Sequence, residues 1–208
     1  MSGQALPKLI LASGSPRRRL LLEELGLTFE TRAVDVDESR LPDEPVEEMV
    51  VRLALAKANA DARPGELVLA ADTVVALGRE VLGKPADRAQ AATMLASLGG
   101  RQHEVLTGVA LVDAGLDRRS SGLERTQVRL GSLDEATIGW YVETGEPLDK
   151  AGAYAIQGLG ALFVEAVEGN YTNVVGLPLP LLRRLFAELG YDLLRFRSDA
   201  TPLTRGRR

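Results

Sequence analysis

Hydrophobic and polar residues follow two kinds of pattern along the chain. Short continuous apolar runs are typical of buried strands, whereas apolar residues spaced three or four apart are typical of amphipathic helices. By the first pattern we expect strands at residues 9–13, 28–34, 67–77, 80–82, 104–112, 124–130, 154–157, 162–167 and 173–175. By the second we expect helices at 17–25, 45–60, 89–98 and 179–189, and one more that ends near 143. Because strands and helices alternate throughout, the sequence predicts an α/β protein.

Residues with strong terminal preferences mark two of these helices. Ser15 is a good N-cap for the first helix, Pro16 fits its first position, and Gly26 fits its C-terminal stop. Ser132 and Glu135 form a capping-box pattern that opens the helix ending near 143.

The bulk properties limit the organisation and the partners of the chain. Its 208 residues suffice for one domain, or for two lobes sharing one core, and we expect that domain to span residues 1–194. Residues 195–208 are polar and arginine-rich, and we expect a poorly ordered tail. A net charge of -4 argues against a broad nucleic-acid surface. We find neither a signal peptide nor the roughly 20 apolar residues of a membrane span, and expect a cytoplasmic protein.

The scarcity of cysteine and histidine restricts the chemistry. The chain has no cysteine, which excludes disulfides, thiolate nucleophiles and cysteine-ligated zinc. Its one histidine, His103, excludes a site with several histidine ligands, and we expect it to be a strand-edge or a hydrogen-bonding residue. Any bound metal must therefore use oxygen ligands, which points to magnesium or manganese.

The first candidate motif, residues 13–18, lies where a strand gives way to a helix. A helix N-terminus offers unpaired N–H groups to a phosphate, and arginines such as Arg17 and Arg18 add planar multidentate donors. The alternative is a plain Ser-Pro cap followed by solvated arginines, which local chemistry alone slightly favours.

Two charged residues interrupt apolar patterns. Asp72 lies in an apolar strand that resumes at Val74, so it is costly there unless it is paired or binds metal. We favour a functional role over a turn cap at the end of the strand. Lys57 shares a helical stripe with Val50 and Leu53, and it either extends outward to solvent, the commoner outcome, or meets an anion inside.

Residues 78–84 imitate a phosphate-binding loop. The spacing of Gly78, Gly83 and Lys84 fits that motif, but Pro85 replaces the hydroxyl residue that would bind magnesium. The residues between the glycines also read as a strand, so we reject a phosphate-loop NTPase. Lys84 remains a candidate phosphate ligand at the end of a hairpin.

The last motif, residues 149–158, ends in Gln157-Gly158. At a strand end, the amide of Gln157 could read a nucleobase edge, since it offers both a donor and an acceptor. The ordinary alternative for the beginning of the motif is a simple Asp149–Lys150 pair in a loop. Trp140 and Tyr141 lie in a helix, where packing is the more usual role.

Taken in order, these motifs resemble the Maf family, in the branch that acts on dTTP and UTP. The resemblance covers residues 9–194 and rests on the order and spacing of 13–18, Glu38, Lys57, 71–75, 83–85, 99–108, 149–158 and 173–178. It implies an ITPase-like α/β fold with an elongated, twisted mixed sheet, flanked by helices and split into two lobes around a cleft. It also implies cleavage of a nucleoside triphosphate to the monophosphate and pyrophosphate with Mg2+ or Mn2+.

The resemblance assigns a role to each matching residue. Asp72 would accept a proton, and Asp72 and Glu38 would hold the metal. The residues that would bind the triphosphate are Ser13, Arg18, Lys57 and Lys84, with the two lysines in the catalytic set. Arg17, Thr73 and Gln157 match the positions that set base preference.

Two other functions remain open at this point. The family is linked to inhibition of septum formation, so the chain could be a nucleotide-binding regulator of cell division. It could also be a pyrophosphatase of other non-standard nucleotides, including purines. The sequence leaves the oligomeric state open, with a homodimer as one option.

Overall fold

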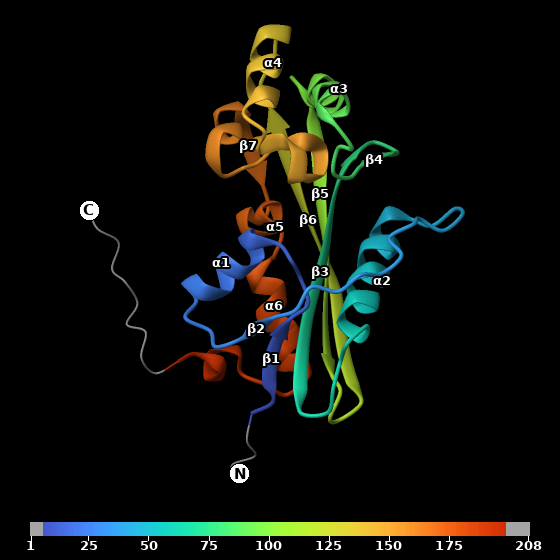
Figure 1. The fold of residues 1–208 in the computed structure, drawn as a ribbon, viewed down its shortest axis with the longest axis vertical. Helices are drawn as coiled ribbons and strands as arrows, with labels where there is room; N and C mark the ends of the chain where they lie inside the picture. Colours follow the sequence, from blue (N-terminus) through green and yellow to red (C-terminus); the bar gives the residue numbers. More distant parts are fainter. Residues whose placement is uncertain (1–5, 199–208) are drawn as a thin grey trace, which may run out of the picture. The chain divides into compact units, whose positions relative to one another are not determined.

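The computed structural model describes residues 6–198 (Figure 1). The strands are β1 Lys8–Leu11, β2 Glu30–Thr31, β3 Glu66–Leu77, β4 Glu80–Leu82, β5 Gln102–Asp113, β6 Arg118–Leu130 and β7 Val164–Glu168. The α-helices are α1 Pro16–Glu24, α2 Val46–Asn59, α3 Arg88–Leu98, α4 Glu135–Glu143, α5 Tyr171–Val175 and α6 Leu179–Glu188. Four 3-10 helices complete the set: η1 Glu146–Asp149, η2 Ala151–Ala153, η3 Gly158–Phe163 and η4 Leu193–Phe196.

The strands form a mixed sheet. Its seven strands follow the order β2-β1-β3-β5-β6-β7, with β4 paired to β3. β1 runs parallel to β2 and to β3, whereas β4 is antiparallel to β3 and β7 is antiparallel to β6. The α/β class and the mixed sheet are thereby confirmed.

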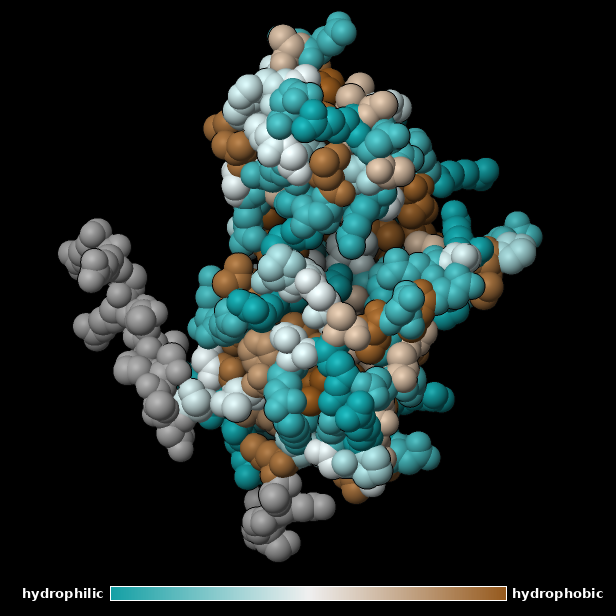
Figure 2. Space-filling view, viewed as in Figure 1, coloured by the Kyte–Doolittle hydropathy of each residue, from teal (hydrophilic) through white to brown (hydrophobic). Residues whose placement is uncertain are grey.

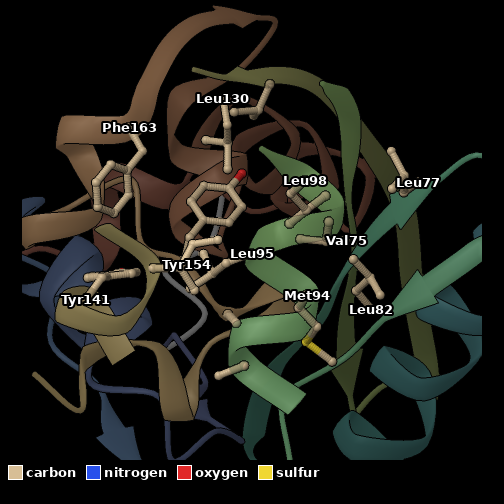
Figure 3. Close-up of a cluster of buried hydrophobic side chains, with 14 of the residues drawn as sticks. Val75, Leu77, Leu82, Met94, Leu95, Leu98, Leu130, Tyr141, Tyr154 and Phe163 are labelled. Atoms are coloured by element: carbon tan, nitrogen blue, oxygen red, sulfur yellow. The ribbon is translucent and has the colours of Figure 1, made fainter. Parts of the chain in front are cut away.

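The chain divides into two compact units, each with its own hydrophobic core. Among residues 6–198, unit 1 comprises 6–72, 108–122 and 179–198, and unit 2 comprises 73–107 and 123–178. In unit 1, buried aliphatic residues of β1, α2, β3 and β5, and one just after β1, pack together: Ile10, Ala12, Ala54, Ala58, Val68, Ala70, Ala110 and Val112. In unit 2, α3 and α4 contribute to a larger cluster that includes Leu95, Tyr141, Tyr154 and Phe163 (Figure 3).

A glycine allows α2 to approach β5 within unit 1. A Cβ atom built on Gly108 would lie 2.2 Å from the backbone oxygen of Val50, so any larger residue would separate helix and strand. This close approach fixes α2, the helix that carries Lys57.

Three details of the secondary structure differ from the sequence-based expectation. Residues 154–157 are not a strand, and 173–175 belong to helix α5, capped by the Asn170 side chain on the N–H of Asn173. The helix ending at Glu143 is capped by Asp134, whose side chain accepts from the N–H of Thr137, and not by Ser132. Short apolar runs fit strand and helix equally well, and tertiary packing decides between them.

The beginning of the expected tail is packed in unit 1. Phe196 is 5% exposed, and its backbone oxygen accepts a 2.7 Å hydrogen bond from the N–H of Thr28. Leu27 and Arg197 form an antiparallel bridge. The remainder of that expected tail, 199–208, lies outside the described residues.

The surface of each unit mixes residue types. On the face shown in Figure 2, hydrophobic residues are scattered among hydrophilic ones. Within residues 6–198, no helix is both long enough and apolar enough to cross a membrane.

Candidate functional site

The junction of β1 and α1 presents an ordered helix N-terminus. The Ser15 side chain caps α1 by accepting from the N–H of Arg18, at 3.5 Å, and Pro16 occupies the first turn. The Ser13 hydroxyl accepts from the N–H of Ser15 and from a guanidinium nitrogen of Arg18, both at 3.2 Å. The expected cap is confirmed, and it brings Ser13 and Arg18 into direct contact.

The surroundings of Arg18 disfavour its positive charge. Burial lowers the pKa of its guanidinium to about 10. The negative charges of Asp72 and Glu38 act to raise this pKa, and the positive charge of Arg17 lowers it further. A lowered pKa means that the surroundings disfavour the positive charge. An added anion beside Arg18 would relieve that cost, which is the property expected of a phosphate ligand.

Asp72 lies inside a strand and is paired. β3 continues through it to Leu77, so the alternative of a turn cap at a strand end is wrong. Asp72 is 8% exposed, and its Oδ1 lies 2.6 Å from the Nζ of Lys57. A buried carboxylate that would otherwise be costly is thus neutralised by a lysine from α2.

Lys57 also pairs with Glu38. Its Nζ lies 2.5 Å from a carboxylate oxygen of Glu38, whose side chain is 62% exposed, whereas that of Lys57 is 13% exposed. Of the two outcomes proposed for this lysine, the inward one is confirmed. One ammonium group therefore bridges two carboxylates within unit 1.

The pair Glu38 and Asp72 fits a hard divalent cation in part. Both supply carboxylate oxygens, and both already lie within contact distance of one positive charge. Within residues 6–198, no group of three or more His, Cys, Asp or Glu side chains could hold a metal. Mg2+ commonly takes one or two carboxylates and completes its coordination with water and phosphate oxygens, so these two residues suit it.

An ion pair that the sequence analysis did not identify holds the loop of Glu38. Arg52 of α2 donates to both carboxylate oxygens of Glu44, at 2.5 and 2.8 Å, and to the backbone oxygen of Ser39, at 3.0 Å. Hydrogen bonding from Arg52 outweighs burial and lowers the pKa of Glu44 to about 2. No motif marks this pair, because Arg52 reads as an ordinary charged residue on the polar face of an amphipathic helix.

Three other candidate residues lie in unit 2. The Thr73 hydroxyl is 2.9 Å from that of Thr107, and Lys84 is exposed just after β4. Gly83 accepts a 3.0 Å hydrogen bond from the N–H of Gly152. Gln157 is exposed and precedes η3 as its N-cap residue, not the end of a strand as expected.

The structure therefore brings together one group of the predicted residues in unit 1. Direct contacts or electrostatic coupling connect Ser13, Arg17, Arg18, Glu38, Lys57 and Asp72. His103, expected to form a hydrogen bond, does so in unit 2, where its Nε2 lies 2.8 Å from the hydroxyl of Tyr154. Burial lowers the pKa of His103 to about 4, so this imidazole is neutral at physiological pH.

Comparison with known proteins gives a consistent result. The family model described as Maf-like protein matches residues 8–189. A dTTP/UTP pyrophosphatase of Anaeromyxobacter dehalogenans (strain 2CP-C) is 52% identical over 189 residues, which cover 90% of this chain and 96% of that protein. A dTTP/UTP pyrophosphatase of Symbiobacterium thermophilum is 50% identical over 190 residues, covering 90% of this chain and 97% of that protein.

Proposed function

The chain belongs to the Maf family, and from this premise we propose that it hydrolyses dTTP and UTP to the monophosphate and pyrophosphate. Relatives that share about half of its residues along nearly their whole length carry the name dTTP/UTP pyrophosphatase. The observation that carries the proposal is the buried Asp72, held by Lys57 at 2.6 Å beside Glu38.

We assign the triphosphate to the N-terminus of α1 and to positively charged side chains. Ser13 and Arg18 already share a hydrogen bond, and Arg18 lies in the first turn of α1. N–H groups and guanidinium nitrogens are the donors that phosphate oxygens prefer. Lys57 and Lys84 add positive charge, and charge that builds on the leaving pyrophosphate would be stabilised by such groups.

Asp72 is assigned the role of general base. A water oxygen bonds to the α-phosphorus while the bond from that phosphorus to the bridging oxygen breaks, and pyrophosphate leaves. The attacking water gives one proton to the Asp72 carboxylate, which passes it to solvent afterwards. A carboxylate held rigidly by Lys57 is suited to orient this water.

Glu38 and Asp72 would hold a divalent cation, either Mg2+ or Mn2+. The bound cation would supply positive charge for the α-phosphoryl oxygens. Its oxygen ligand set agrees with a chain that has no cysteine and a single histidine.

Base preference is assigned to Arg17, Thr73 and Gln157. A uracil or thymine edge presents carbonyl acceptors around one N–H donor, and a glutamine amide complements such an edge. A site built for this pattern would reject other bases, because mismatched polar groups stay buried and unpaired.

The experiment is a substrate panel. The purified protein is incubated with dTTP, UTP, dCTP, dATP and dGTP in the presence of Mg2+ or Mn2+, and pyrophosphate and orthophosphate are measured separately. We expect pyrophosphate from dTTP and UTP, and no activity with EDTA. Direct release of orthophosphate and a diphosphate would contradict the proposal, whereas equal rates on all five would remove only the pyrimidine assignment.

The same assay separates the enzyme from a pure regulator of division, since binding alone needs neither a base nor a metal pair. We further propose that it acts in the cytoplasm on nucleotides and not on nucleic acids. A net charge of -4 supports the choice of a small substrate.

A further inference from the structure

A hydrogen-bond network in unit 2 centres on Glu146, at the start of η1 directly after α4. One carboxylate oxygen accepts from the N–H of Gly160, at 2.9 Å, and the other from the N–H of Leu159, at 3.0 Å. The Tyr141 hydroxyl donates to the first oxygen at 2.8 Å. Three donors therefore converge on one carboxylate, which can only accept.

Tyr141 extends the network to the other side of the same loop. Its hydroxyl accepts a 3.2 Å hydrogen bond from the N–H of Ala155 while it donates to Glu146. The ring is fully buried and packs edge-on against Phe163, with centroids 5.0 Å apart, in the cluster of Figure 3. This packing fixes where the hydroxyl points.

Two glycines let the loop close tightly around these groups. A Cβ on Gly158, which has a φ of +80°, would lie 2.5 Å from the carboxylate of Glu146. A Cβ on Gly160 would lie 2.5 Å from both the Ala155 backbone oxygen and the Tyr141 hydroxyl. The loop 155–160 is thus closed at its base and leaves no room for larger side chains there.

Gln157 is carried by this closed loop. Its neighbours on one side are held by Tyr141 at Ala155, and on the other by Glu146 at Leu159 and Gly160. Within residues 6–198, the Gln157 side chain is exposed and makes no hydrogen bond, so it is available to a ligand.

The carboxylate form of Glu146 fits this task. Burial would raise its pKa, but the N–H groups of Gly160 and Leu159, then the Tyr141 hydroxyl and the charge of Lys150, outweigh burial and lower it. The lowered pKa shows that the network stabilises the ionised acceptor.

We propose that Glu146 and Tyr141 are positioning residues for base selection: they hold loop 155–160 so that Gln157 meets the pyrimidine edge. The inference rests on the proposed function, in which Gln157 contacts the base. It adds two residues that touch neither substrate nor metal and act only through Gln157.

The first test measures the loop itself and needs no substrate. Backbone amide hydrogen exchange is compared in the parent protein, in Glu146→Gln and Tyr141→Phe, and in the control Glu143→Gln. Glu143 is a 70% exposed carboxylate at the end of α4 that pairs with Arg88. In Glu146→Gln we expect the exchange rates of Leu159 and Gly160 to rise roughly tenfold, the scale of a lost charged hydrogen bond. In Tyr141→Phe we expect the exchange rate of Ala155 to rise. Unchanged exchange in both variants would overturn the proposal.

The second test measures selectivity. The ratio of kcat/KM for UTP to that for CTP should fall roughly tenfold in Glu146→Gln and less in Tyr141→Phe, mostly through KM, with no change in Glu143→Gln. In a Gln157→Ala background, Glu146→Gln should lower the ratio no further, because residues that act through one another are not additive.

A ligand without a base separates positioning from a general folding defect. Inorganic tripolyphosphate should inhibit all of these variants with the same inhibition constant. Weaker inhibition of Glu146→Gln, or a full additional loss of selectivity in the Gln157→Ala background, would show a merely structural role and refute the inference. If the parent protein itself makes no distinction between bases, the pyrimidine assignment fails and this inference with it, whatever the exchange rates.

Discussion

Charged side chains hold the candidate residues of unit 1 in place, whereas backbone hydrogen bonds hold the loop of Gln157 in unit 2. In unit 1, Lys57 is bonded to Glu38 and Asp72, so each charge depends on the others. In unit 2, Glu146 and Tyr141 bind main-chain N–H groups and leave the Gln157 side chain exposed. The two groups therefore offer different chemistry: unit 1 presents coupled charges, and unit 2 presents the neutral amide of Gln157 on a loop held by hydrogen bonds.

We expect the largest effect from a substitution in the charged group of Lys57, Glu38 and Asp72. Asp72→Asn keeps the shape but removes the proton acceptor, so turnover should fall by about two orders of magnitude or more on every substrate. Asp72→Asn should lower stability but keep the fold, because Lys57 loses one of its two carboxylate partners and retains Glu38. The measurement is kcat for dTTP together with a thermal melt.

Asp113→Asn is the matched control for Asp72→Asn. Asp113 is also buried on a strand, but it binds Tyr191 and the turn after β5. It should keep near-normal kcat. Near-normal turnover in Asp72→Asn would make Asp72 a structural residue.

The next effect tests Arg18 as a phosphate ligand. Arg18→Met should lower kcat/KM by roughly tenfold to a hundredfold, the scale of a lost charged hydrogen bond, and equally for dTTP and UTP. Arg19→Met is the control, since Arg19 is exposed and pairs with Glu23. A loss that differed between bases would place Arg18 in base recognition instead.

A smaller effect concerns base choice. Gln157→Ala should reduce the preference for UTP over CTP roughly tenfold while leaving the dependence of rate on Mg2+ concentration unchanged. Gln102→Ala, another exposed glutamine of unit 2, should change neither quantity. An altered Mg2+ dependence with intact preference would contradict the assignment of Gln157 to base recognition.

The smallest effect is on stability at acid pH. The pKa of Glu44 is lowered from its ordinary 4.5 to about 2, so its contribution is complete above about 4.5 and is lost as the pH falls towards 2. The free energy of unfolding is measured by chemical denaturation at several pH values in this window. It should fall less steeply with decreasing pH in Arg52→Met than in the parent protein. Lys8→Met, which removes an exposed pair with Glu30, should follow the parent curve. Parallel curves for Arg52→Met and the parent would show that Arg52 does not lower the pKa of Glu44.

Sequence patterns located the charged group better than the neutral one. The helical stripe through Val50 and Leu53 left Lys57 open between an outward and an inward position, and the apolar run around Asp72 marked a charge that needs a partner. The structure joins the two residues. Both signals arise because a charged residue within an apolar pattern is costly to bury without a partner.

The loop of Gln157 gave a weaker signal. Residues 154–157 read as a strand, yet Tyr154 and Ala155 are buried by the packing of unit 2 without strand pairing. The sequence predicts packing for Tyr141 and no role for Glu146, because their partners are backbone N–H groups that carry no residue identity. The sequence also does not predict the pair of Arg52 and Glu44, because charged residues are common on protein surfaces and only the fold brings these two together.

Water attacks at the α-phosphorus in the proposed reaction, and incorporation of oxygen-18 tests this point. The protein hydrolyses dTTP in water enriched in oxygen-18, and the products are analysed by mass spectrometry. We expect one labelled oxygen in dTMP and none in the pyrophosphate. Label in the pyrophosphate, or labelled orthophosphate with dTDP, would contradict it.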